Sequence, residues 1–108
     1  MLPGDIIKGK GEYRRDLYVS LYSSKSLYLS NIVVMTSQQK LELTKDDPQG
    51  KVKSVEFYKI FGMVTDFDSL GEKIPHKDGV VQILFNNKMW WVRAADLQIV
   101  KLGQGLSG

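Results

Sequence analysis

The chain has 108 residues, of which 43% are hydrophobic and 25% are charged. This length suits a single domain, and the composition is far from the low hydrophobicity that keeps a chain disordered. The formal net charge of +3 is a weak indication of an anionic partner, and the absence of cysteine excludes a disulfide framework, a thiolate nucleophile and a cysteine-type zinc site.

The N-terminal half is predicted to form short strands, because apolar and polar residues alternate there with a period of two. A first strand is expected at residues 5–8 and a second at residues 17–22, with Leu17, Val19 and Leu21 on one face. The polar residues 23–26 are expected to turn the chain into a further strand at residues 27–35. These two strands would form a hairpin.

The middle of the chain is predicted to alternate strands with polar turns. Alternation at residues 41–44 is followed by the clearest turn, residues 45–50, in which Pro48 and Gly50 favour a chain reversal. A strand is expected to resume at Val52 and to continue through Val55 and Phe57. Residues 62–64 lead into the polar stretch 66–69, and residues 70–78 are predicted to form a surface loop.

The C-terminal third contains the strongest hairpin signal. Residues 80–85 and 89–93 are strand-like and are separated by Asn86-Asn87, a pair that tolerates the positive φ of a tight turn. Residues 94–96 allow one helical turn before a last strand at residues 97–102. The glycine-rich residues 103–108 are expected to form a flexible tail. The period of two predicts an all-β fold without long helices.

Five segments stand in an order that is informative about the fold. They are Gly4-Asp5-Ile6-Ile7-Lys8, Phe61-Gly62-Met63-Val64, Gly79-Val80-Val81-Gln82-Ile83-Leu84-Phe85, Trp90-Trp91-Val92 and Asp96-Leu97-Gln98-Ile99-Val100. In this order they resemble the short SH3-like barrel proteins encoded by tailed bacteriophages. The resemblance covers the N-terminal strand and the last third of the chain. It implies a single small SH3-like barrel over residues 1–102, with inserted strands at residues 10–60, in which Asp96 caps the helical turn.

The resemblance also implies a function. Members of that family include virion accessory proteins, so the chain is expected to be a non-enzymatic virion structural or accessory protein. Its partners would be other virion proteins or further copies of itself, and it would reside in the virion or the host cytoplasm. The first residues lack the pattern of a signal peptide, and the longest apolar runs are too short to cross a membrane.

Neither a catalytic centre nor a metal site is predicted. The single histidine, His76, lies in the expected surface loop and cannot supply the several imidazoles of a typical transition-metal site. Asp66 and Asp68, with Glu72 nearby, lack the spacing of a calcium-binding loop and are better explained as turn residues. No cofactor is expected.

An aromatic and basic cluster is the candidate interaction site, and it consists of Tyr18, Tyr22, Tyr28, Arg14, Arg15 and Trp91. The tyrosines are expected on the strand face opposite Leu17, Val19 and Leu21. Such a surface is typical of a protein interface, and it is also suited to stacking the bases of a nucleic acid. An ordinary solvent-facing aromatic ladder is a third interpretation. Trp90 and Trp91 must point to opposite faces, so one is expected in the core and the other exposed, covered by the insertion or buried by a partner.

Overall fold

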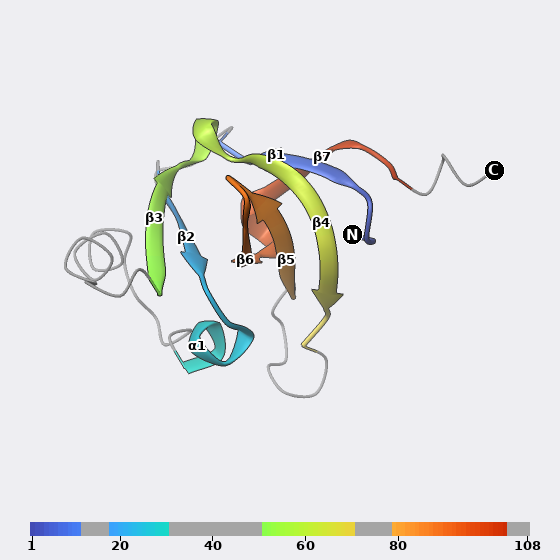
Figure 1. Cartoon of the computed structure of the whole chain (residues 1–108). Helices are drawn as coiled ribbons and strands as arrows, with labels where there is room; N and C mark the ends of the chain where they lie inside the picture. The colour runs from blue at the N-terminus through green and yellow to red at the C-terminus, as the bar shows by residue number, and fades with distance from the viewer. Residues whose placement is uncertain (12–17, 31–50, 71–78, 104–108) are drawn as a thin grey trace.

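A single antiparallel sheet organises the chain. The computed structural model describes residues 1–11, 18–30, 51–70 and 79–103. Within these ranges seven strands lie in the order β3-β2-β6-β5-β4-β1-β7 (Figure 1). The strands are β1 (Ile6–Gly9), β2 (Tyr18–Tyr22), β3 (Val52–Glu56), β4 (Phe61–Asp68), β5 (Val80–Phe85), β6 (Lys88–Arg93) and β7 (Leu97–Lys101). Helix is confined, in the described chain, to α1 (Lys25–Ser30) and the 3-10 turns η1 (Phe57–Lys59) and η2 (Ala94–Asp96). The prediction of an all-β fold is confirmed.

The β5–β6 hairpin forms where the sequence predicts it. Asn86 and Asn87 have φ values of 51° and 62°, which is the left-handed conformation that a tight primed turn requires at both positions. The strands on either side are in continuous antiparallel register, from Phe85 opposite Lys88 to Val80 opposite Arg93. This hairpin forms the centre of the sheet.

The predicted helical turn before the last strand is also present, as η2. Asp96 is nevertheless not its cap, because Asp96 is the last residue of the turn, and Arg93 occupies the N-cap position without a side-chain cap bond. The carbonyl of Asp96 instead accepts a hydrogen bond from the Lys10 N–H at 2.9 Å. The turn is therefore tied to the end of β1 through its backbone.

The expected hairpin after β2 is wrong, because residues 25–30 form α1. The Ser24 hydroxyl accepts a hydrogen bond from the Leu27 N–H at 3.1 Å, and the Ser24 carbonyl accepts one from the Tyr28 N–H. A serine hydroxyl that satisfies the first free N–H groups of a helix stabilises the helix start. The polar segment therefore begins a helix rather than reversing a hairpin. The strand expected at residues 31–35, the alternation at 41–44 and the turn at 45–50 lie outside the described residues.

The connection between β3 and β4 differs from the prediction in one respect. The strand resumes at Val52 as expected, but it ends at Glu56, and Phe57 lies in η1. This single turn redirects the chain into β4, which arches over β5 and β6 in Figure 1. Of the predicted surface loop, Leu70 is buried, and residues 71–78 lie outside the described residues.

Two hydrophobic clusters lie on opposite faces of the sheet. The inner cluster contains Trp90 with Ile7, Val19, Leu21, Val55, Ile60, Val64, Val81, Ile83, Phe85, Val92 and Leu97. The outer cluster contains Trp91 with Tyr22, Tyr28, Val52, Leu70 and Val80, and Leu27 and Leu29 of α1 pack against it. The two tryptophans therefore point to opposite faces, as predicted, and Trp91 is covered by α1, part of the predicted insertion.

A buried carboxylate joins the two ends of the described chain. Asp5 is only 1% exposed, and its two carboxylate oxygens accept hydrogen bonds of 2.9 Å from the Leu2 and Gly103 N–H groups. Its backbone carbonyl also accepts one from the Val64 N–H. Gly103 must be small here, because a Cβ atom would lie 2.3 Å from the Gly4 carbonyl carbon. These bonds fasten the chain before β1 to the chain after β7 and to β4.

We expect Asp5→Asn to lower the free energy of unfolding by roughly 1.5–3 kcal/mol at pH 7, since hydrogen bonds to a charged group are lost. The two N–H donors hold the pKa of Asp5 below its usual value of 3.8. The stabilisation is therefore complete above that value and is lost as the pH falls through the lowered pKa.

Chemical denaturation at pH 7 and pH 3 measures this difference. Asp66→Asn is the matched control, because the exposed Asp66 carboxylate accepts one local N–H bond from Phe67. The control should change stability by less than about 0.5 kcal/mol. An Asp5→Asn deficit that persists unchanged at low pH would contradict the charged role of Asp5.

Candidate functional site

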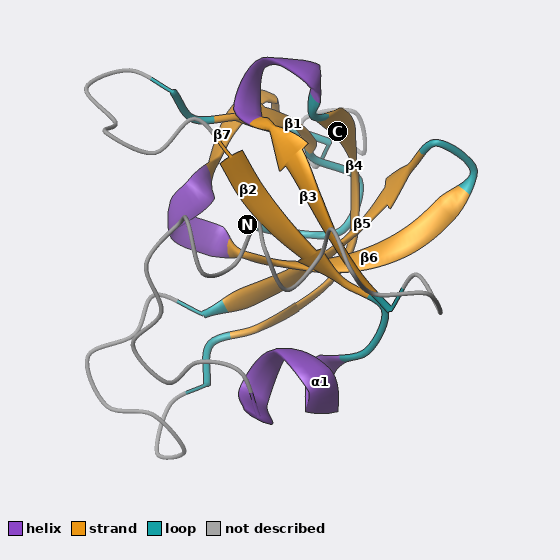
Figure 2. Cartoon of the chain, turned by 90° about the vertical axis from the view of Figure 1, so that its left-hand side faces the viewer, coloured by secondary structure: helices purple, strands orange, loops and turns teal. Residues whose placement is uncertain are grey.

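Most of the predicted aromatic cluster is buried. Tyr22, Tyr28 and Trp91 belong to the outer cluster, and the rings of Tyr22 and Tyr28 meet edge to face at 5.4 Å. The expectation that these tyrosines face solvent is wrong, because α1 packs over this end of β2 and β6 (Figure 2). Tyr18 is half-buried, and Arg14 and Arg15 lie outside the described residues. The structure therefore does not bring the predicted site together as an exposed surface.

Electrostatic contacts hold α1 in this position. The Lys25 Nζ lies 3.0 Å from Asp68 Oδ2 and 5.5 Å from the centroid of the Trp91 ring. Burial raises the pKa of the Tyr22 hydroxyl, so this group is neutral at physiological pH. The aromatic residues under α1 serve as a second core, and their substitution is expected to affect stability.

Tyr22→Ala should therefore destabilise the fold by roughly 3–5 kcal/mol, the range for truncating a buried aromatic ring. Tyr18 lies on the same strand and face but is half-buried. Tyr18→Ala should therefore lower the free energy of unfolding clearly less than Tyr22→Ala does. Thermal or chemical denaturation of both variants measures the contrast. Equal, small losses at both positions would mean that α1 does not cover Tyr22.

The rest of the outer sheet face carries an apolar row that no other element of the described chain covers. We call this surface the open face and define it by Ile6, Phe61, Met63, Leu84, Met89 and Val100. The strand register places Met89, Leu84, Met63 and Ile6 in one row, each opposite the next across neighbouring strands. Met63 and Leu84 are 39% exposed, Met89 is 44% exposed and Phe61 is 62% exposed. Contiguous apolar area of this kind typically marks an interaction site.

Polar contacts border the open face. The Thr65 hydroxyl lies 3.1 Å from both the backbone carbonyl and the side-chain oxygen of Gln82, and 3.7 Å from the sulfur of Met89. At the other end, Lys8 stands opposite Phe61, and Lys101 stands opposite Ile6. The surface thus has an apolar centre with a cationic end at β1 and β7.

The sequence did contain a signal for this surface. The segments at residues 80–85 and 88–93 carry apolar residues at both odd and even positions. Both faces of these strands are therefore apolar and require a cover. The sequence analysis placed the candidate interaction site on the tyrosines instead. It missed the methionines and Leu84, because a single apolar residue at a strand position does not reveal whether another element covers it.

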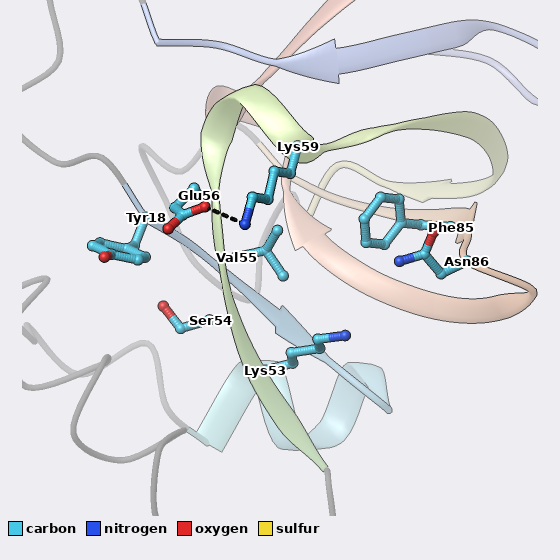
Figure 3. A pocket seen from close by; sticks show the side chains of 8 residues that line it. All are labelled: Tyr18, Lys53, Ser54, Val55, Glu56, Lys59, Phe85 and Asn86. Carbon is cyan, nitrogen blue, oxygen red and sulfur yellow. Dashed lines mark ion pairs between the residues drawn. The ribbon is translucent and has the colours of Figure 1, made fainter.

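A cleft of about 310 Å³ lies beside β3, at the tip of the β5–β6 hairpin (Figure 3). Val55, Lys53 and Lys59 line it on one side, and Phe85 and Asn86 lie across from them. Its remaining lining residues are Tyr18, Ser54 and Glu56. Tyr18, a member of the predicted cluster, thus borders this cleft.

The charged groups of this cleft neutralise one another in part. Lys59 Nζ lies 2.7 Å from Glu56 Oε2, and the Tyr58 hydroxyl donates a hydrogen bond of 2.9 Å to the same oxygen. These hydrogen bonds from Lys59 and Tyr58 lower the pKa of Glu56, and the carboxylate in turn raises the pKa of Lys59 and of Tyr58. The hydroxyl oxygen of Ser54 is buried without a hydrogen-bond partner, so no described side chain is positioned to act as its base.

The described residues offer no group of three or more acidic, histidine or cysteine side chains that could hold a metal ion. The interpretation of Asp66 and Asp68 as turn residues is wrong, because both lie in β4 and pair with Gln82 and Val80 of β5, although their carboxylates accept local N–H bonds from Phe67 and Leu70. Glu72 and His76 lie outside the described residues. Among the helices in the described ranges, none has the length and apolar character needed to cross a bilayer.

Comparison with protein-family models, curated proteins and solved structures gives no match for this chain.

Proposed function

We propose that this chain is a non-enzymatic virion structural or accessory protein of a tailed bacteriophage, and that it acts by docking on another protein. Two observations support the proposal. The five segments whose order along the chain resembles that of phage SH3-like barrel proteins coincide largely with β1, β4, β5, β6 and β7. These same five strands carry the open face, which is the observation on which the proposal chiefly depends.

The open face is suited to a protein partner for physical reasons. Its side chains stand on hydrogen-bonded neighbouring strands, so little backbone freedom is lost when a partner covers them. Methionine is flexible and polarisable, and it adapts to the shape of an apposed surface. Because Lys8 and Lys101 flank the apolar row, the best partner has an apolar centre and acidic groups at its rim.

The predicted alternative, nucleic-acid binding by the tyrosine and arginine cluster, loses its main support. Stacking requires exposed ring faces, whereas Tyr22, Tyr28 and Trp91 are buried under α1. Docking through this cluster loses support for the same reason. We therefore assign docking to the open face, with the virion as the proposed location.

The test introduces a charge into the open face. Leu84→Glu and Met89→Glu should abolish incorporation into particles of the virus that encodes the chain, because a carboxylate would be buried against the partner. Both side chains are substantially exposed in the free protein, so the variants should fold with little change in stability. Incorporation is measured by mass spectrometry of purified particles.

Leu102→Glu is the matched control, since Leu102 is an exposed leucine beyond the end of β7 and outside the open face. It should be incorporated as well as the wild type. Absence of the wild-type chain from particles would contradict the virion proposal. Normal incorporation of both face variants would contradict docking through the open face.

A further inference from the structure

The corner between β3 and β4 carries two strongly exposed aromatic rings. Tyr58, in η1, is 67% exposed, and Phe61, at the start of β4, is 62% exposed. Figure 1 shows this corner as the turn at the top of the molecule, where β3 passes into β4. The Phe57 ring meets the Tyr58 ring edge to face at 5.7 Å, and the Tyr58 hydroxyl is bonded to Glu56. The Tyr58 ring is therefore held in place while most of its surface is open to solvent.

Hollows adjoin this corner on two sides. The cleft of Figure 3 includes Lys59 of η1. A second hollow of about 350 Å³ includes Phe57 and Tyr58 of η1 together with Lys8 and Gln98. Lys8 is also the register partner of Phe61, so one lysine lies beside both exposed rings. The corner thus forms an aromatic ridge between two depressions.

The charge of the ridge is positive. Lys8 and Lys53, one in each hollow, form no ion pair with any described residue. Glu56 is the carboxylate among the residues that line the two hollows, and it is already paired with Lys59. An anionic ligand on this corner would therefore meet the unneutralised ammonium group of Lys8 beside the exposed rings, and that of Lys53 farther along β3 in the adjoining cleft.

We propose that this ridge binds single-stranded nucleic acid, with bases stacked on Tyr58 and Phe61 and phosphates near Lys8 and Lys53. Exposed rings interleaved with lysines are the arrangement that binds single strands without sequence preference, because every base has a stacking face and every nucleotide has a phosphate. The excess of cations favours this ligand over a protein surface, which would have to supply several carboxylates at the same spacing. The ridge adjoins the open face, because Phe61 belongs to both and Lys8 lies beside both, whereas Tyr58 and Lys53 lie outside the open face. The ridge proposal does not depend on the virion proposal.

The experiment measures the fluorescence anisotropy of a labelled oligothymidylate of twelve nucleotides as the protein is added, at several salt concentrations. Wild-type affinity should fall steeply with salt, with a log–log slope of about −0.7 for each phosphate that is neutralised. Tyr58→Ala should weaken binding at least about fivefold without changing that slope, since it removes stacking but no charge. Lys8→Gln should weaken binding and reduce the slope by about 0.7.

Glu56→Gln gives an outcome that a merely structural role would not produce. It removes the one carboxylate of the ridge and releases Lys59 while leaving an acceptor for the Tyr58 hydroxyl, so binding should tighten several-fold. Met89→Ala and Lys51→Gln are the controls, because both residues are exposed and lie outside the two hollows. Both should bind the oligonucleotide as the wild type does.

Three results would overturn the proposal. The first is that the wild-type chain does not bind the oligonucleotide even at low salt. The second is that the Tyr58→Ala variant binds as well as the Met89→Ala variant. The third is that the Glu56→Gln variant binds more weakly than the wild type. Failure here would leave the ridge as a protein contact or bare surface. It would not affect the particle-incorporation test, in which Tyr58, Lys8 and Glu56 are unchanged.

Discussion

Two adjacent tryptophans on β6 impose the constraint on which the architecture depends. Successive side chains of a strand point to opposite faces, so Trp90 and Trp91 cannot share one core. Trp90 is buried in the inner cluster, and Trp91 requires a cover on the outer face, which α1 and Leu70 provide. The chain therefore builds two cores from one sheet, and a short helix capped by Ser24 is needed to complete the second.

The cover is partial, and this determines where the interaction surfaces lie. Helix α1 packs over β2 and the neighbouring part of β6, where Tyr22, Trp91 and Val80 meet. Further along the same sheet, Met89, Leu84 and Met63 continue the apolar row without a described element above them. The open face is thus the continuation of a hydrophobic surface that the fold covers at one end only.

The charged residues reinforce this division. Around α1, Lys25 and Asp68 neutralise each other beside Trp91, as suits a contact that is internal to the fold. At the corner of β3 and β4, by contrast, lysines outnumber carboxylates and stand next to exposed rings. A folded chain gains little stability from such an arrangement, because exposed like charges repel and rings that are more than 60% exposed bury little area. Both features are what the proposed nucleic-acid ligand would use.

The sequence by itself determined the fold class, the β5–β6 hairpin, the helical turn before β7 and the opposition of the two tryptophans, because each follows from a period of two or from local turn chemistry. It could not determine α1, since the capping role of Ser24 competes with a hairpin turn of similar composition. Nor could it tell that Tyr22 is covered while Met89 is open, because both are apolar side chains at outward strand positions. Which of them meets solvent depends on an element distant in sequence, and only the tertiary structure decided it.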